Sequence, residues 1–174
     1  MSNIVKDDLY FMRAAYNVAI VHSTDPSTQN GAVIVDGLYR KLLSQGANHF
    51  PEHVTESLDR WERPIKYSYV EHAERNAIYA AAKIGVGLDG MTMYCPWAAC
   101  ADCARAIIQS GIRRLVTHKI MADATPDHWK SSIVIATRML QEAGVIHDEL
   151  IIPISDIQIR FNGSLWVPDG RHDA

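Results

Sequence analysis

The sequence lacks the features that mark several broad classes of protein. It has 17 lysines and arginines against 20 aspartates and glutamates, and its net charge of -3 provides no basic excess for neutralising nucleic-acid phosphates. No stretch approaches the roughly 18 apolar residues that span a bilayer, and residues 1–8 contain no apolar signal-peptide core. Internal repeats are also missing. These absences argue against a nucleic-acid partner or a membrane protein, and they favour a cytoplasmic protein with a small polar substrate.

Cysteine is scarce, with three in 174 residues. Cys100 and Cys103 form a C-x-x-C pair, and the third is Cys95. Three cysteines do not build a disulfide framework in a domain of this size, so reduced thiols available to a metal are the simpler interpretation. Because 48% of the residues are apolar, the chain can bury one core, but it is short for two domains. We therefore expect one compact domain.

Hydrophobic periodicity predicts alternating helices and strands. Helical patterns cover residues 6–23, 72–83, 101–110 and 127–143, and strand patterns cover residues 32–35, 39–44, 91–95 and 114–118. Asp36-Gly37 indicates a tight hairpin between the first two strands, whereas residues 46–69 form a long connection without a clear period. The strand-helix-strand unit at 91–118 favours two parallel strands. The predicted fold is a three-layer α/β/α domain with a mixed sheet of about five strands.

Residues 151–174 are predicted to extend this domain. We divide the sequence into a main domain at residues 1–150 and a C-terminal extension at 151–174 that packs on the same domain. Asn162-Gly163, between apolar clusters, predicts a second hairpin there. The pattern leaves open whether the extension adds strands, an oligomer contact or a pocket wall.

Two short segments carry residues typical of a catalytic metal site. Cys100 and Cys103 are three apart at a predicted helix start, so both sulfurs lie on one face and can reach one ion. His72 begins another predicted helix and offers a nitrogen ligand. Glu74, two residues further on, points to a different side of that helix, where it can transfer protons instead of binding the metal. Three protein ligands leave a fourth tetrahedral position for water.

Other interpretations of these segments remain. A C-x-x-C pair alone also fits a structural zinc half-site or a redox pair, and His-x-Glu is common by chance. A structural zinc ion would need a fourth ligand from Cys95, His118 or His128. Packing is expected for Cys95, which lies in a strand pattern, and the two histidines are expected to be ordinary polar residues. The two segments together therefore favour catalysis.

The residues around both segments resemble a known family. The runs 72–78 and 100–112 are similar to the H-x-E and P-C-x-x-C signature of the zinc-dependent cytidine/deoxycytidylate deaminase superfamily. Within this superfamily, the chain is most similar to the dCMP deaminases, because segments 23–35 and 46–51 resemble theirs. Ala99 departs from the pattern, because the family usually has proline directly before the first cysteine.

The resemblance implies a function and a role for each matching residue. A small-molecule nucleotide is the implied substrate: dCMP would be converted to dUMP and ammonia by attack of zinc-bound hydroxide at C4 of the ring. Family members commonly self-associate, so a homo-oligomer is expected. The implied Zn²⁺ ligands are His72, Cys100 and Cys103, the proton shuttle is Glu74, and the substrate contacts are Asn48 and the backbone of Ala73.

The substrate leaves alternatives open. Another nucleoside, nucleotide or modified base, or adenine in tRNA, would suit the same metal site, although the acidic charge counts against tRNA. A zinc-stabilised binding module without catalysis is an interpretation of a different class. For a nucleotide, Arg60, Arg63 and Lys66 in the long connection are candidate phosphate ligands, or simply a solvated face.

Overall fold

The computed structural model describes residues 3–170 of the chain, with side chains described from Lys6 onward. Residues 1–2 of the predicted main domain and residues 171–174 of the predicted extension lie outside the described residues. Among the residues described, no helix is both long and apolar enough to cross a membrane. The helices are α1 (Asn3–His22), α2 (Lys66–Tyr69), α3 (Ala73–Lys83), α4 (Ala101–Gln109), α5 (Lys119–Asp123) and α6 (Asp127–Glu142), with a 3-10 turn η1 (Leu58–Trp61). The strands are β1 (Gly31–Asp36), β2 (Lys41–Ala47), β3 (Thr92–Tyr94), β4 (Arg114–His118), β5 (Ile146–Leu150), β6 (Ile159–Phe161) and β7 (Ser164–Trp166).

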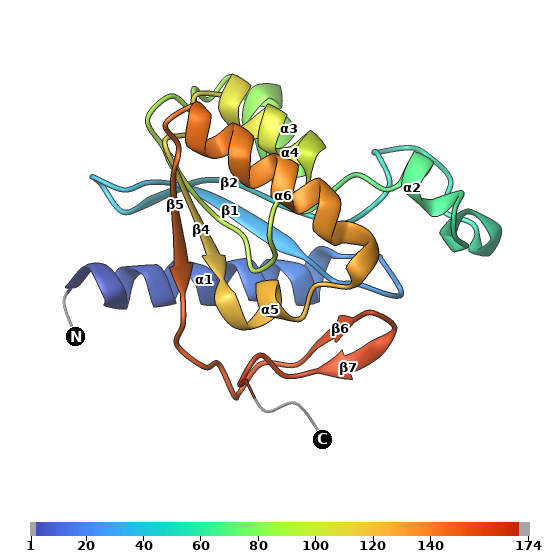
Figure 1. Ribbon diagram of the computed structural model, residues 1–174. Helices are drawn as coiled ribbons and strands as arrows, with labels where there is room; N and C mark the ends of the chain where they lie inside the picture. The colour runs from blue at the N-terminus through green and yellow to red at the C-terminus, as the bar shows by residue number, and fades with distance from the viewer. Residues whose placement is uncertain (1–2, 171–174) are drawn as a thin grey trace.

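A mixed five-stranded sheet with the order β2-β1-β3-β4-β5 forms the middle layer. Strand β1 is antiparallel to both β2 and β3, whereas β3, β4 and β5 are parallel to one another. Helices α3, α4 and α6 cover one face of the sheet, and α1 covers the other (Figure 1). The predicted three-layer α/β/α fold with a mixed sheet is therefore confirmed.

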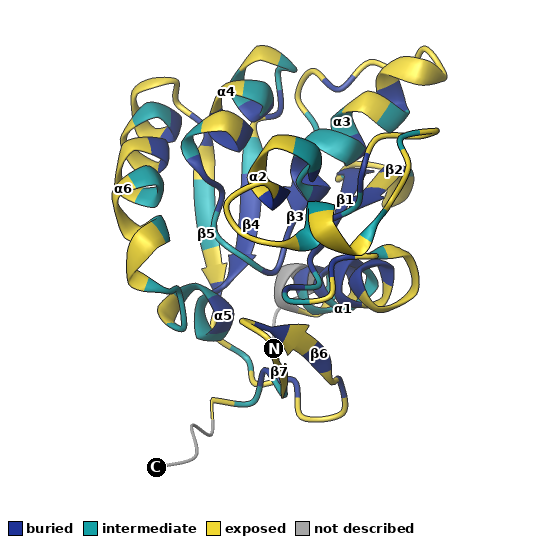
Figure 2. Ribbon diagram, turned by 90° about the vertical axis from the view of Figure 1, so that its right-hand side faces the viewer, coloured by how far each residue is buried: buried dark blue, intermediate teal, exposed yellow. Residues whose placement is uncertain are grey.

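The central strands are buried on both faces (Figure 2). Along β1, Ala32 and Ile34 join the core beneath α3, α4 and α6, whereas Val33 and Val35 join the core beneath α1. Alternate side chains of a strand point to opposite faces, so a strand covered by helices on both sides is apolar throughout. This continuous apolar run is what fixes β1 between the two helical layers.

Gly46 allows α3 to lie directly against β2. A Cβ atom at this position would lie 2.2 Å from the backbone nitrogen of Ala77 and 2.6 Å from the carbonyl oxygen of Ala73. Backbone atoms cannot rotate away as a flexible side chain can, so only glycine fits this contact. The close contact holds the first turn of α3, which carries His72 and Glu74 at its start, against the end of β2.

The predicted two-residue turn at Asp36-Gly37 is wrong. Strand β1 continues through Asp36, and the turn occupies residues 37–40. The Asp36 carboxylate accepts hydrogen bonds from the N–H groups of Leu38 and Tyr39, at 2.9 and 3.1 Å, which stabilises the longer turn. The positive backbone angle falls on Arg40, with φ of 53°, and not on the Asp-Gly pair.

Several helices and strands of the structure were not predicted from the sequence. The long connection at 46–69 contains the end of β2, η1 and α2, and the short helix α5 was not predicted. Strand β5, which runs from Ile146 to Leu150 beside β4, was not predicted either. Single turns of helix and edge strands have too few residues to show a period, which explains these differences.

The C-terminal segment forms a separate two-stranded sheet of β6 and β7. Asn162 and Gly163, with φ of 50° and 85°, form its turn, as predicted. The hairpin also bonds to the loop before β1, because Gly163 N donates to Ser27 O at 2.8 Å and Gln29 N donates to Arg160 O at 2.9 Å. The side chains that it and the preceding residues bury in the core beneath α1 are Ile154, Ile157, Ile159 and Phe161.

Asp8 ties α1 to the sheet. Its carboxylate accepts hydrogen bonds from Arg114 at 2.7 and 2.8 Å and from the Tyr94 hydroxyl at 2.7 Å. Burial raises the pKa of Asp8, but the hydrogen bonds from Arg114 and Tyr94 and the charge of Arg114 outweigh it and hold this pKa below its ordinary value of 3.8. The ionised carboxylate is therefore favoured by the folded state.

We expect Asp8→Asn to lower the free energy of unfolding at neutral pH by about 1–3 kcal/mol. Because the folded-state pKa is depressed, the wild-type carboxylate stabilises the fold above pH 3.8 and loses this contribution as the pH falls through the lowered pKa. Urea unfolding followed by circular dichroism would measure both effects. Asp156→Asn, which removes an exposed partner of Arg13, is the control and should change stability little. An equal loss in the two variants would contradict this role for Asp8.

Candidate active site

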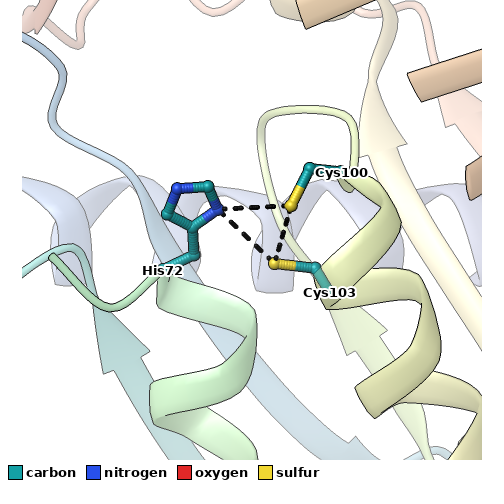
Figure 3. Close-up of side chains that lie close together, drawn as sticks. All are labelled: His72, Cys100 and Cys103. Carbon is teal, nitrogen blue, oxygen red and sulfur yellow. Dashed lines mark hydrogen bonds between the residues drawn. The ribbon is translucent and has the colours of Figure 1, made fainter. Parts of the chain in front are cut away.

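Three potential metal ligands meet where α3 and α4 begin (Figure 3). His72 directly precedes α3, Cys100 directly precedes α4, and Cys103 lies in the first turn of α4. The distances from His72 Nδ1 to the sulfurs of Cys100 and Cys103 are 3.6 and 3.5 Å, and the two sulfurs are 3.6 Å apart. Among the described residues, these three form the one group of His, Cys, Asp or Glu residues close enough to hold a metal ion.

The triangle formed by these atoms fits zinc. Tetrahedral coordination with ordinary Zn–S and Zn–N bond lengths places two sulfurs roughly 3.8 Å apart and a nitrogen roughly 3.6 Å from each sulfur. The observed separations of 3.5 to 3.6 Å agree within a few tenths of an ångström. One imidazole and two thiolates are also the donor set of known catalytic zinc sites, with the fourth position left for water or substrate.

The surroundings of the sulfurs favour a thiolate. Contact with Cys103, together with His72, lowers the pKa of the Cys100 thiol to about 3, although burial opposes this effect. Conversely, the contact with Cys100 and burial raise the pKa of Cys103. A thiolate is the form that binds zinc. The site is therefore prepared for a cation.

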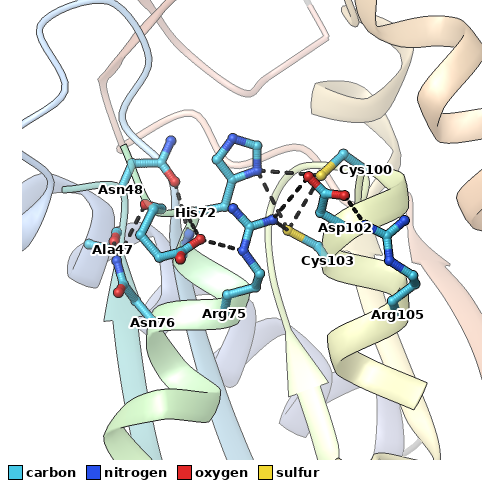
Figure 4. Close-up of polar contacts among 11 residues, drawn as sticks. Ala47, Asn48, His72, Arg75, Asn76, Cys100, Asp102, Cys103 and Arg105 are labelled. Atoms are coloured by element: carbon cyan, nitrogen blue, oxygen red, sulfur yellow. Dashed lines mark hydrogen bonds and ion pairs between the residues drawn. The ribbon is translucent and has the colours of Figure 1, made fainter. Parts of the chain in front are cut away.

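Arg75 is a site residue to which the sequence had assigned no role. Its guanidinium donates a hydrogen bond to Cys103 Sγ at 3.4 Å (Figure 4). On its other side the guanidinium is bonded to the carboxylate of Glu71. Glu71 also accepts the N–H of His72, at 3.1 Å. Arg75 therefore places a positive charge beside the sulfur of Cys103. Through Glu71, it also links Cys103 to the backbone of His72. Its spacing of three residues from His72 on one helix face is the signal that could have identified it.

Glu74 is buried beside the metal group and is not part of it. It is 2% exposed, and its Oε2 has no hydrogen-bond partner among the described residues. Burial raises the pKa of its carboxyl group, against the opposing charge of His72. A carboxyl group with a raised pKa and a free oxygen can both accept and donate a proton.

A pocket of about 320 Å³ opens onto Glu74, His72 and Cys100. Trp97 and Trp129 form aromatic walls and meet edge to face with ring centroids 6.1 Å apart. Trp97 is held by a hydrogen bond of 2.9 Å from its ring nitrogen to Thr125 Oγ1 and by packing against Phe161 of the C-terminal hairpin. Aromatic walls suit a flat heterocyclic ligand. The complete lining is Asn30, Asn48, His72, Glu74, Trp97, Ala98, Cys100, Trp129 and Ile133.

Of the two predicted substrate contacts, Asn48 lines this pocket and Ala73 does not, and the two residues are hydrogen-bonded to each other. Asn48 Oδ1 accepts the N–H of Ala73 at 2.9 Å, and Asn48 Nδ2 donates to the carbonyl of Thr28 at 3.2 Å. Asn48 lines the pocket, whereas the N–H of Ala73 is already used by this bond. A contact from either residue to substrate stays a prediction.

A second cavity of about 300 Å³ shares Asn48, His72, Trp97 and Trp129 with the first and is also lined by Arg63 and Lys66. Lys66 is 4% exposed, and its ammonium donates to the Asp25 carboxylate at 2.7 and 2.8 Å and to Ser27 Oγ at 2.6 Å. Arg60, by contrast, stacks over the ring of Tyr69 and bonds to Thr55 O. Of the three candidate phosphate ligands, two therefore lie at the cavity.

The other candidate metal ligands serve different purposes. Cys95 Sγ accepts a hydrogen bond from Asn30 Nδ2 at 3.2 Å. Both ring nitrogens of His118 are engaged, one with the Tyr16 hydroxyl at 2.7 Å and the other with Ile152 O at 3.0 Å. The ring of His128 lies against Trp129, and this histidine is not part of the metal group. The packing and polar roles expected for these residues therefore agree with the structure.

Comparison with known proteins identifies the family. A model of the cytidine and deoxycytidylate deaminase zinc-binding region matches residues 5–119. An uncharacterised deaminase of Aliivibrio fischeri is 38% identical over 123 residues, which cover 71% of this chain and 80% of that protein. The deoxycytidylate deaminase of Homo sapiens is 34% identical over 160 residues, which cover 88% of this chain and 84% of that protein.

A solved structure agrees with this at the level of the fold. The dCMP deaminase from the cyanophage S-TIM5 superimposes with a TM-score of 0.65 and 22% identity, covering 86% of this chain and all of that one. The chain belongs to the cytidine and deoxycytidylate deaminase family. It is a zinc-dependent deaminase, an enzyme of the hydrolase class.

Proposed function

We propose that the enzyme deaminates a deoxycytidine nucleotide, converting dCMP and water to dUMP and ammonia. The observation that carries this proposal is the position of Glu74: it is buried, has a free carboxyl oxygen, and lies beside the His72, Cys100 and Cys103 group in one aromatic pocket. Relatives named deoxycytidylate deaminase cover most of the chain and support dCMP as the substrate.

In this proposal each residue has a separate task. His72, Cys100 and Cys103 would hold the zinc ion, which would supply a Lewis acid and lower the pKa of a bound water molecule. Glu74 would take one proton from the attacking water and deliver it to the ring nitrogen beside the amino group, then take the second proton of that water and deliver it to the amino group, which leaves as ammonia. Trp97 and Trp129 bind the faces of the base and keep bulk water away.

The phosphate belongs, in this proposal, in the second cavity. Arg63 is exposed there, and its guanidinium has no hydrogen bond or ion pair among the described residues. Lys66, in contrast, is bonded to Asp25 and Ser27. A guanidinium can bind two phosphate oxygens at once, so Arg63 is the more available ligand. The two cavities share four lining residues and so adjoin each other, and the proposal places the base in the first and the phosphate in the second.

We expect the zinc-loaded enzyme to release ammonia from dCMP faster than from dCTP, CMP or deoxycytidine. Arg63→Gln should raise the KM for dCMP by about tenfold and leave the KM for deoxycytidine unchanged, because only the nucleotide carries a phosphate. Arg60→Gln, at an arginine outside both cavities, is the matched control. A steady-state ammonia assay measures all of these.

The outcomes of this assay separate the remaining interpretations. Faster turnover of another nucleoside, nucleotide or modified base would assign the enzyme a different substrate. No ammonia from any compound in the series, with zinc bound and the fold intact, would overturn the proposal and indicate a non-catalytic binding module.

We further propose that residues 151–174 extend the same domain and that the enzyme self-associates. The buried side chains and backbone hydrogen bonds of β6 and β7 support the first statement as far as residue 170. For the second, β2 lies at an edge of the sheet beside a groove lined by α1, β2 and α3, where a second copy would cover the exposed Leu42, Tyr79 and Ile84. The cytoplasmic location stays a prediction.

A further inference from the structure

Asn30 presents an unused hydrogen-bond acceptor at the active-site pocket. The residue directly precedes β1, is 3% exposed, and lines the same pocket as Glu74 and His72. Its side-chain Oδ1 has no partner among the described residues. A buried carbonyl oxygen without a partner destabilises the protein unless a ligand or water supplies a donor.

The Asn30 side chain is held in place by its other end. Its amide nitrogen donates to Cys95 Sγ at 3.2 Å, and its backbone carbonyl accepts the N–H of Asn48 at 3.0 Å. Cys95 is completely buried, at the end of β3 in the core beneath α3, α4 and α6. With the nitrogen and the backbone both fixed, the orientation of Oδ1 is set before any ligand binds.

Among the described residues, three buried side-chain oxygen or nitrogen atoms have no hydrogen-bond partner. Two of these atoms belong to residues that line this pocket. They are Oδ1 of Asn30 and Oε2 of Glu74, and the third, Oγ of Ser44, lies outside the pocket on β2. The proton transfer assigned to Glu74 accounts for its free oxygen, whereas no step described so far uses Asn30. The pocket therefore contains a hydrogen-bond acceptor, Asn30 Oδ1, to which the proposed reaction assigns no role.

We propose that Asn30 is a specificity-determining residue whose side-chain carbonyl oxygen accepts a hydrogen bond from the exocyclic amino group of the substrate base. This inference rests on the proposed function, because the amino group is the one N–H donor that the cytosine ring carries. The product carries a carbonyl oxygen at the same ring position, and this oxygen has no proton to donate to Asn30. Asn30 thus favours the aminated base over the deaminated one and aids release of the product.

Equilibrium binding tests this assignment without turnover. In a Glu74→Gln background, isothermal titration calorimetry would measure the Kd of the zinc-loaded protein for dCMP and for dUMP, with and without Asn30→Leu, which keeps the approximate size of the side chain but removes the acceptor. We expect Asn30→Leu to weaken dCMP binding about tenfold or more and to leave dUMP binding within about twofold. Zinc content and circular dichroism verify the metal and the fold, and Asn30→Ala replaces the leucine variant if the latter does not fold.

Ser44→Ala is the matched control, because it removes a buried unpartnered oxygen away from the pocket and should change neither Kd. Equal weakening of dCMP and dUMP by Asn30→Leu would indicate a purely structural role and overturn the proposal. Unchanged binding of both would also overturn it, since water would then satisfy Asn30. In either case, turnover of dCMP by the wild-type enzyme would leave the proposed function intact.

Discussion

Glu74→Gln is expected to reduce the rate of dCMP deamination by about 10² to 10⁴, the usual contribution of a general acid and base. Glutamine has nearly the same size and hydrogen-bonding atoms but cannot exchange a proton, so the fold and the metal group should remain. Glu74 is not among the three residues close enough to share an ion, and zinc content should therefore be unchanged. Ammonia release and metal analysis on the same preparation would measure both quantities.

The control is Glu142→Gln, at an exposed glutamate at the end of α6, which should match the wild type. A Glu74→Gln protein with full zinc content and an unchanged rate would contradict the proton-transfer role. Loss of zinc together with activity would instead indicate that Glu74 supports the metal ligands.

Gly46→Ala is expected to damage stability and the metal site together. The added methyl group would meet the backbone of α3 at 2.2 Å from Ala77 N, and a contact this short can only be relieved if α3 moves away from β2. Overpacking of this kind costs about 1–3 kcal/mol, occasionally more. Because His72 and Glu74 begin the displaced helix, we expect weaker zinc retention and at least a tenfold loss of dCMP turnover.

Thermal unfolding, competition with a zinc-binding dye and the ammonia assay would measure these three effects. Gly87→Ala is the matched control: a Cβ atom there meets nothing within 4 Å, and Gly87 has no positive φ. Wild-type zinc retention and turnover in Gly46→Ala would show that the position of α3 is not critical for the site.

The metal group was predictable because its information is local. The three-residue spacing of Cys100 and Cys103 and the two-residue spacing of His72 and Glu74 each fix directions on one helix start, whatever the rest of the chain does. The sheet was predictable for a similar reason, since the continuous apolar run of β1 requires cover on both faces.

The walls of the pocket were not predictable, because they depend on contacts between distant segments. Trp129 and Ile133 lie in the helical pattern predicted for residues 127–143, which did not indicate that both would line the pocket. The sequence did not single out Asn30, and the role proposed for it depends on a contact with Cys95, 65 positions later. A helix period shows which face is apolar but not whether that face meets protein or ligand.

The contact between the C-terminal hairpin and the loop before β1 also has a consequence for synthesis of the protein on the ribosome. All the residues proposed to hold zinc and move protons have been synthesised once the chain reaches Cys103. Phe161, which packs against Trp97, and Gly163, which donates to Ser27 O, are synthesised later. A nascent chain can therefore bring its proposed metal ligands together while Trp97, a wall of the pocket, still lacks its contact with Phe161. These contacts can form only after residues 161–163 have left the exit tunnel.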